Sequence, residues 1–101
     1  MGCKINWQPT AYTTFYEEID FINLKWNNKE VIKFMELVDV NLERLSNNPL
    51  LGKQEPKYNL YCLVISKQTT LYYKYFQENS IIELFVFWNN SKNPDGLVGL
   101  L

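Results

Sequence analysis

Histidine is absent from this 101-residue chain, and arginine occurs once, as Arg44. Histidine is the side chain that most often moves protons at neutral pH, and arginine is the one best suited to bidentate contacts with phosphate. The formal net charge is −1, so the basic surplus typical of proteins that bind nucleic-acid backbones is also missing. These deficits argue against ordinary phosphate-cleaving chemistry, and they leave open only a local basic stripe.

Cysteines and long apolar runs are scarce as well. Cys3 and Cys62 match no metal-binding spacing, and nothing in the chain points to an oxidising compartment in which a disulfide would persist. We interpret Cys62 as a small buried side chain within an apolar strand. No apolar run approaches membrane-spanning length, and the first residues lack the apolar stretch of a signal peptide. We therefore expect one cytoplasmic domain, residues 1–101, without a membrane partner, a metal or a cofactor.

Three runs rich in aromatic and β-branched residues lie between residues 58 and 88, separated by polar breaks at 66–69 and 77–80. Such residues suit a pleated, half-buried surface, and breaks this short allow only hairpins. We predict an antiparallel meander in which Tyr61 faces opposite to Cys62, while Tyr73 and Tyr75 face opposite to Tyr72. One face must meet the helices. The other is open to a protein partner, to stacked bases or to ordinary cross-strand packing.

Two helices are predicted before the meander from apolar residues spaced three and four apart. Pro9 suits the first turn of the first helix, and Asn27, with Glu30 three residues later, suits the N-cap of the second. Acidic residues off the first stripe, Glu18 among them, are expected to be solvated. The first stripe is Tyr12, Phe15, Ile19, Ile22 and Trp26, and the second is Val31, Phe34, Val38, Leu42 and Leu45.

A short strand at 4–8 precedes the helices, a connecting loop at 50–57 follows them, and an apolar segment at 97–101 ends the chain. Helices joined by so short a turn are antiparallel neighbours, and the meander is the only partner large enough to bury their apolar surface. We predict an α+β fold of order β-α-α-β-β-β, an antiparallel sheet with an N-terminal helical hairpin packed on one face. The segment 97–101 either folds back on the hairpin or is covered by a partner.

Four phrases stand in order along the chain: Trp7-Gln8-Pro9-Thr10-Ala11; Asn48-Pro49-Leu50-Leu51-Gly52-Lys53; Val64-Ile65-Ser66-Lys67 leading into Thr70-Leu71-Tyr72-Tyr73; and Asn93-Pro94 after a final aromatic strand. Together they resemble the RelE/ParE toxin superfamily over nearly the whole chain. The resemblance implies a small cytosolic toxin of a type II toxin–antitoxin module, with a cognate antitoxin as its partner. RelE-like members cut messenger RNA on the ribosome, whereas ParE-like members are associated with inhibition of DNA gyrase.

The basic residues of the RelE-like nucleases do not transfer to this chain. Where the resemblance implies them, the chain has Tyr61 and Leu63 on one strand and Thr70 on the next, and Lys92 stands near the expected C-terminal arginine. Tyr73 is the only polar sheet residue that fits the nuclease pattern. We therefore predict a ParE-like toxin that inhibits growth, acts in plasmid stabilisation and works by binding a macromolecular target, with DNA gyrase as a candidate.

Candidate site residues follow from this interpretation. No residue is assigned as catalytic, but if the chain is a nuclease the candidates are Tyr73, Lys53 and Lys92. The candidate partner-binding residues are Tyr61, Tyr73, Tyr75, Trp88 and Leu97. Two alternatives stay open, a ribosome-dependent mRNA endoribonuclease with an atypical residue set and a non-toxic binding module of the same fold.

Overall fold

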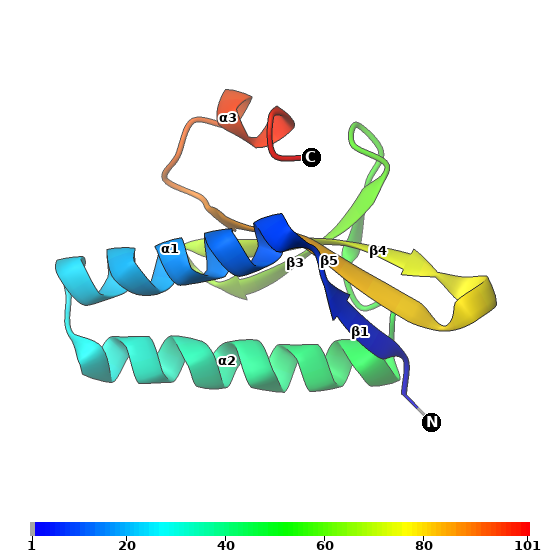
Figure 1. Cartoon of the computed structure of the whole chain (residues 1–101), viewed down its shortest axis with the longest axis horizontal. Coiled ribbons are helices and arrows are strands. Elements are labelled where there is room, and N and C mark those ends of the chain that lie inside the picture. The colour runs from blue at the N-terminus through cyan, green and yellow to red at the C-terminus, as the bar shows by residue number, and fades with distance from the viewer. Residues whose placement is uncertain (1) are drawn as a thin grey trace.

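A five-stranded sheet with two long helices on one face forms the framework of the molecule (Figure 1), in a computed structural model that describes residues 2–101. The strand order across the sheet is β1-β5-β4-β3-β2. The elements in chain order are β1 (Lys4–Trp7), α1 (Pro9–Lys25), α2 (Asn28–Asn47), β2 (Lys53–Glu55), β3 (Leu60–Ser66), β4 (Thr69–Phe76), the 3₁₀ turn η1 (Gln77–Asn79), β5 (Ile81–Asn89) and α3 (Asp95–Val98).

The predicted meander of β3, β4 and β5 is confirmed, but the sheet extends further on both sides. β1 pairs with β5 in parallel, so the sheet is not purely antiparallel as predicted. β2 pairs with β3 in antiparallel fashion, within the segment that was predicted to be a loop. The segment Lys53–Glu55 carries no apolar alternation, and only its ladder with β3 makes it a strand.

A β-bulge in β5 sets which residues share a face. Tyr72 pairs with Val86, whereas the next residue, Tyr73, pairs with Leu84, so Phe85 is the extra residue. Leu84 packs in the main core under the helices, while Phe85 and Val86 pack in a smaller cluster apart from it. The bulge therefore adds an aromatic ring to the face of the sheet that the helices do not cover.

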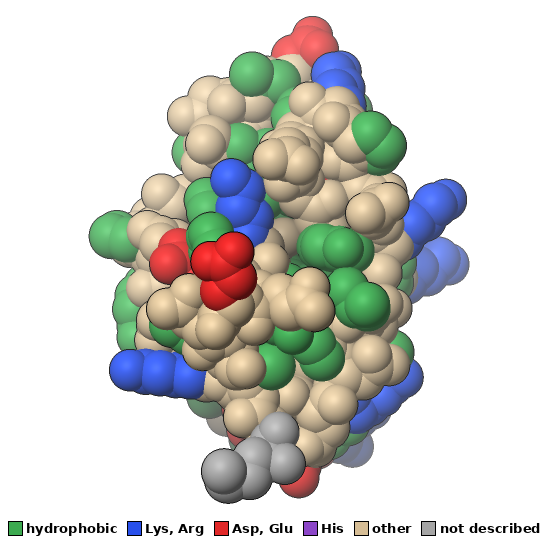
Figure 2. All heavy atoms as spheres, turned by 90° about the vertical axis from the view of Figure 1, so that its right-hand side faces the viewer, with side chains coloured by type: hydrophobic (Ala, Val, Ile, Leu, Met, Phe, Trp, Pro, Cys, Tyr) green, Lys and Arg blue, Asp and Glu red, His purple; other side chains and the backbone are tan. Residues whose placement is uncertain are grey.

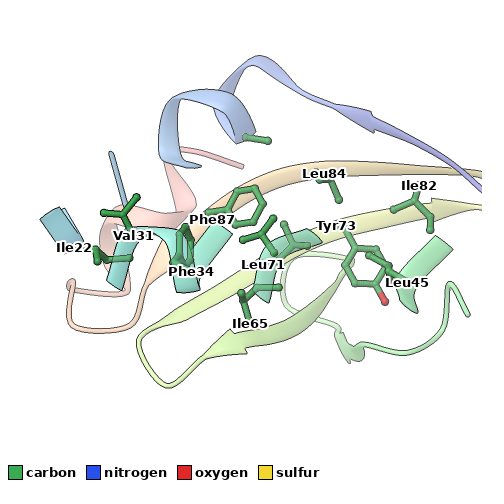
Figure 3. Packing of buried hydrophobic residues seen from close by; sticks show 12 residues of the cluster. Ile22, Val31, Phe34, Leu45, Ile65, Leu71, Tyr73, Ile82, Leu84 and Phe87 are labelled. Carbon is green, nitrogen blue, oxygen red and sulfur yellow. The ribbon is translucent and has the colours of Figure 1, made fainter. Parts of the chain in front are cut away.

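The main core lies between the helical pair and the sheet. Figure 3 shows Phe34 of α2 beside Phe87, Leu71 and Ile65 of the strands. The predicted stripe of α2 is confirmed, because all five of its residues pack in or against this cluster. The stripe of α1 is only half right, since Tyr12 and Trp26 are about half exposed.

Two polar residues of α1 that lie off the predicted stripe, Thr14 and Glu18, are buried. Thr14 Oγ1 accepts a hydrogen bond from the backbone N–H of Phe87 at 2.9 Å, so a helix side chain satisfies a group of the sheet. Glu18, which was expected to be solvated, is 2% exposed. Its carboxylate is buried because it accepts hydrogen bonds from Thr69 and Asn89.

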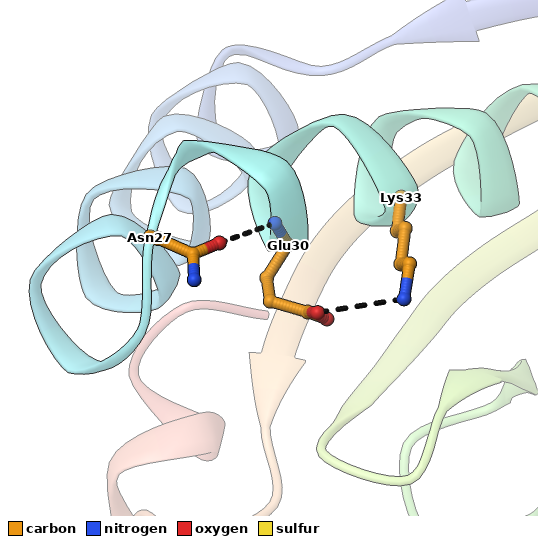
Figure 4. A network of polar contacts seen from close by, with 3 residues as sticks. All are labelled: Asn27, Glu30 and Lys33. Atoms are coloured by element: carbon orange, nitrogen blue, oxygen red, sulfur yellow. Dashed lines mark hydrogen bonds and ion pairs between the residues drawn. The ribbon is translucent and has the colours of Figure 1, made fainter.

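The second helix begins at the predicted cap. Asn27 Oδ1 accepts a hydrogen bond from the N–H of Glu30 at 3.0 Å, and Glu30 pairs in turn with Lys33 (Figure 4). An unpaired donor in the first turn is thereby satisfied, and the turn between α1 and α2 is fixed.

Replacing Asn27 by alanine should lower the free energy of unfolding by about 1 kcal/mol, because the cap hydrogen bond is lost. Urea denaturation of the purified protein measures the change. Asn28→Ala is the matched control, since Asn28 lies inside α2 and no cap hydrogen bond is formed by its side chain. Equal losses in the two variants would show that the cap does not contribute.

Candidate functional site: the open face of the sheet

The face of the sheet turned away from α1 and α2 carries lysine, cysteine and tyrosine side chains in neighbouring strands. We call it the open face. Cross-strand pairing places residues in rows across it, because paired residues share a face. The rows are Lys53–Cys62–Tyr72–Val86, Val64–Thr70–Trp88 and Lys74–Glu83.

The C-terminal segment covers one end of the open face. Leu97 of α3 is 3% exposed and packs against Val86 and Trp88, and Gly96 lies against the Trp88 ring. The segment 97–101 therefore docks through Leu97 on the open face, while Leu100 and Leu101 line a shallow pocket with residues at the start of α1. Figure 1 shows α3 at the top of the molecule and α2 at the bottom. Trp88 and Leu97, both candidate partner-binding residues, become accessible only if this cover moves.

Three lysines lie over aromatic rings on or beside the open face. The ammonium of Lys74 is 5.7 Å from the ring centre of Phe85, that of Lys92 is 5.7 Å from Trp88, and that of Lys57 is 5.4 Å from Tyr58. Each contact is a cation–π interaction, which holds a charged group against an apolar surface. The face thus combines positive charge with aromatic surface.

Two ionisable groups in the row of Lys53 are shifted toward their neutral forms. Burial raises the pKa of the Cys62 thiol above 9.0, with Glu55 adding to the increase and Lys53 opposing it. Burial also raises the pKa of Tyr72 above 10.0, and the neighbouring Cys62, Glu55 and Tyr58 add to it. Both groups are therefore protonated at neutral pH, so they can donate hydrogen bonds but are poorly suited to act as a base or a nucleophile.

The two layers of the molecule differ in charge. The segment 9–47, which forms α1 and α2, contains seven acidic and four basic residues, whereas the rest of the chain contains four acidic and six basic ones. The near-neutral net charge of the chain is the sum of an acidic helical layer and a moderately basic set of residues outside it. The small excess of basic residues lies outside the two long helices, and a local basic stripe stays a prediction.

Tyr73, predicted both as a nuclease candidate and as a partner-binding residue, is fully buried on the helix side of the sheet. Its hydroxyl donates to the carbonyl of Pro49 at 3.0 Å and accepts from the N–H of Gly52 at 2.9 Å. A Cβ atom at Gly52 would lie 2.6 Å from that hydroxyl, so only glycine fits. Tyr73 thus anchors the turn after α2 and does not join Lys53 and Lys92.

Tyr61 and Tyr75 lie on the helix side as well, where both pack against the main core. Both are half-buried, and with Asn59, Lys74 and Phe76 they line a shallow pocket of about 220 Å³ at the end of the sheet. Figure 2 views this end of the molecule, where hydrophobic side chains reach the surface in several places between polar groups. A partner-binding role for these two tyrosines stays a prediction.

Tyr72, Lys74 and Phe85 of the open face were not among the candidate site residues predicted from the sequence. The alternation of the tyrosines was predicted correctly, but not which phase faces the helices. The polar residues of the strand indicate which set of alternate side chains faces away from the helices. Thr70 and Lys74 lie on the same side of the strand as Tyr72, so this side is the more polar one. Phe85 was not predictable in this way because the bulge breaks the alternation.

Within residues 2–101, no three His, Cys, Asp or Glu side chains come together as a metal site requires. In the same part of the chain, none of the helices combines the length and the apolar character needed to cross a lipid bilayer. Both cysteines are free thiols.

Comparison with known proteins places the fold. No protein-family model matches the sequence, and none of the curated proteins does. The structure is similar to a chain in the crystal structure of the toxin–antitoxin complex RelBE2 from Mycobacterium tuberculosis, with a TM-score of 0.64 and 14% sequence identity. The match covers 88% of this chain and 99% of that one. The two chains share the RelE-like fold. The α+β fold implied by the resemblance to RelE/ParE toxins is therefore confirmed.

Replacing Tyr73 by phenylalanine should destabilise the protein by about 1–3 kcal/mol, because the N–H of Gly52 and the carbonyl of Pro49 both lose their partner. Urea denaturation at neutral pH gives the change. Tyr16→Phe is the control, since Tyr16 is 60% exposed and packs outside the core. A Tyr73→Phe variant as stable as the control would contradict the anchoring role.

The contribution of Tyr73 should also fall at high pH. Burial raises its pKa to about 12, whereas an unfolded tyrosine titrates near 10.0. The unfolded chain therefore loses this proton first, so the stabilisation is complete below pH 10 and declines as pH rises toward 12. Denaturation between pH 9 and pH 12 should show the wild type losing stability more steeply than Tyr73→Phe. Parallel curves would contradict the assignment.

Proposed function

We propose that this protein is the toxin of a type II toxin–antitoxin module, neutralised by a cognate antitoxin. The proposal is supported by the fold, because nearly the whole length of a chain from a toxin–antitoxin complex superimposes on it. The resemblance of local phrases to the RelE/ParE superfamily supports it independently of the coordinates. A low sequence identity leaves the activity to be argued from the side chains.

The composition of the open face favours binding over cutting, as in the ParE-like branch. Cleavage through a ribose hydroxyl needs a base, an acid and cations that hold the phosphate in the transition state. The face offers lysines, but its Cys62 and Tyr72 keep their protons at neutral pH, and the chain has no histidine. We therefore expect the open face to bind its target through lysine charges and aromatic contacts. DNA gyrase is the candidate target that the resemblance implies.

One observation favours the RelE-like alternative, an mRNA endoribonuclease with an atypical residue set. Lys53, Lys74 and Lys92 all lie on or beside the open face, although they are distant in sequence. Lysine side chains can stabilise a phosphate transition state by their charge without taking a proton. In that case the tyrosine concerned is Tyr72, because Tyr73 points into the core.

Expression of the protein in bacteria should arrest growth, and co-expression of the antitoxin gene encoded beside it should restore growth. Lys74→Glu should relieve the arrest by reversing a charge on the open face. Lys29→Glu makes the same charge change on the exposed surface of α2 and should leave the arrest intact.

Inhibition of DNA supercoiling by purified gyrase then tests the target. Inhibition by the wild type and not by Lys74→Glu would support the ParE-like proposal. Growth arrest without gyrase inhibition would remove gyrase as the target. A folded protein that causes no arrest would contradict the toxin proposal and favour a non-toxic binding module.

A further inference from the structure

Glu18 is a buried acid with no opposite charge beside it. Its side chain points from the centre of α1 toward the sheet and is 2% exposed. Among residues 2–101, Lys33 and Glu30 form the ion pair, and Glu18 takes no part in one. Burying a carboxylate in this way is costly unless hydrogen bonds compensate. Here they come from the hydroxyl of Thr69 and from Asn89 Nδ2, the latter at 3.0 Å.

The two donors are cross-strand partners at the end of the sheet, where β5 leaves it. Asn89 extends the hydrogen-bond network from Glu18 to Ser91. Its Oδ1 accepts from the N–H of Ser91 at 2.9 Å and from Ser91 Oγ at 2.6 Å. The side-chain oxygen of Glu18 accepts from the NH₂ group of Asn89, and this orientation of the amide leaves Asn89 Oδ1 directed at Ser91.

The orientation of one amide thus fixes the start of the exit segment, which we define as residues 89–92. Lys92 follows directly, with its N–H bonded to the carbonyl of Asn89 at 3.0 Å and its ammonium over the ring of Trp88. On the other side of the strand, Asn90 is held independently by Thr70 and by the backbone of Gln68. The exit segment has two anchors, and only the one on the helix side depends on Glu18.

We propose that Glu18 is a positioning residue, which orients the Asn89 amide and so places the exit segment, with Lys92 and α3, on the open face. An apolar side chain at this position would bury more favourably than an acid, so what the carboxylate contributes is a single geometry of its neighbours. The inference links the helical layer to the open face and holds whichever macromolecule binds there.

Backbone amide hydrogen exchange followed by NMR tests the proposal on the full chain. Glu18→Leu removes the acceptor and should speed exchange of the Ser91 amide about tenfold, while amides in β3 and β4 keep their rates. Glu18→Gln should give a smaller increase, because one oxygen remains but the orientation of Asn89 is no longer forced. Glu17→Gln removes the same charge from the exposed neighbour and should change nothing.

Combining substitutions at Glu18 and Asn89 tests whether Glu18 orients the Asn89 amide or only stabilises the fold in general. In an Asn89→Ala background, Glu18→Gln should have no further effect on Ser91, because the amide that it orients is gone. An unchanged Ser91 rate in Glu18→Gln and Glu18→Leu would overturn the proposal. So would a uniform rise at all amides, or full additivity with Asn89→Ala. If Glu18→Leu does not fold, Glu18→Gln and the Asn89 background decide the question alone.

Discussion

The pairing of β4 with β5 is the constraint on which the rest of this molecule depends. Side chains alternate across a strand, so one register decides which residues meet the helices and which lie on the open face. Here Leu71, Tyr73 and Leu84 go inward, while Tyr72 and Lys74 go outward. The bulge at Phe85 then shifts the phase of β5 and brings both Val86 and Trp88 to the open face.

Much of this architecture was predictable from the residues because local patterns were strong. The cap at Asn27, the stripe of α2 and the three strands of the meander all follow from spacing and residue type. The prediction was wrong where the deciding interaction is not local. β2 exists through its ladder with β3, and Glu18 is buried because residues more than 50 positions away supply its hydrogen bonds.

The candidate site shows the same division. Lys53 and Lys92 were predicted as residues of interest and lie on or beside the open face, but Tyr73 was assigned to the wrong side. Its spacing suits either phase, and what fixes it inside is the pair of hydrogen bonds to the turn after α2. That turn is the Asn48–Lys53 phrase on which part of the RelE/ParE resemblance depends, so the phrase has a structural role in this chain. The polar network from α1 to the exit segment connects the acidic helical layer to the lysines and aromatic rings opposite it.

We propose that the open face binds its target and does not cut it. The most direct measurement is the mapping of transcript ends after the purified protein is added to a translating bacterial extract. Binding alone predicts the same ends for the wild type and for a variant in which Lys53, Lys74 and Lys92 are all alanine. New ends that appear with the wild type and vanish with the triple variant would contradict the claim and establish a nuclease.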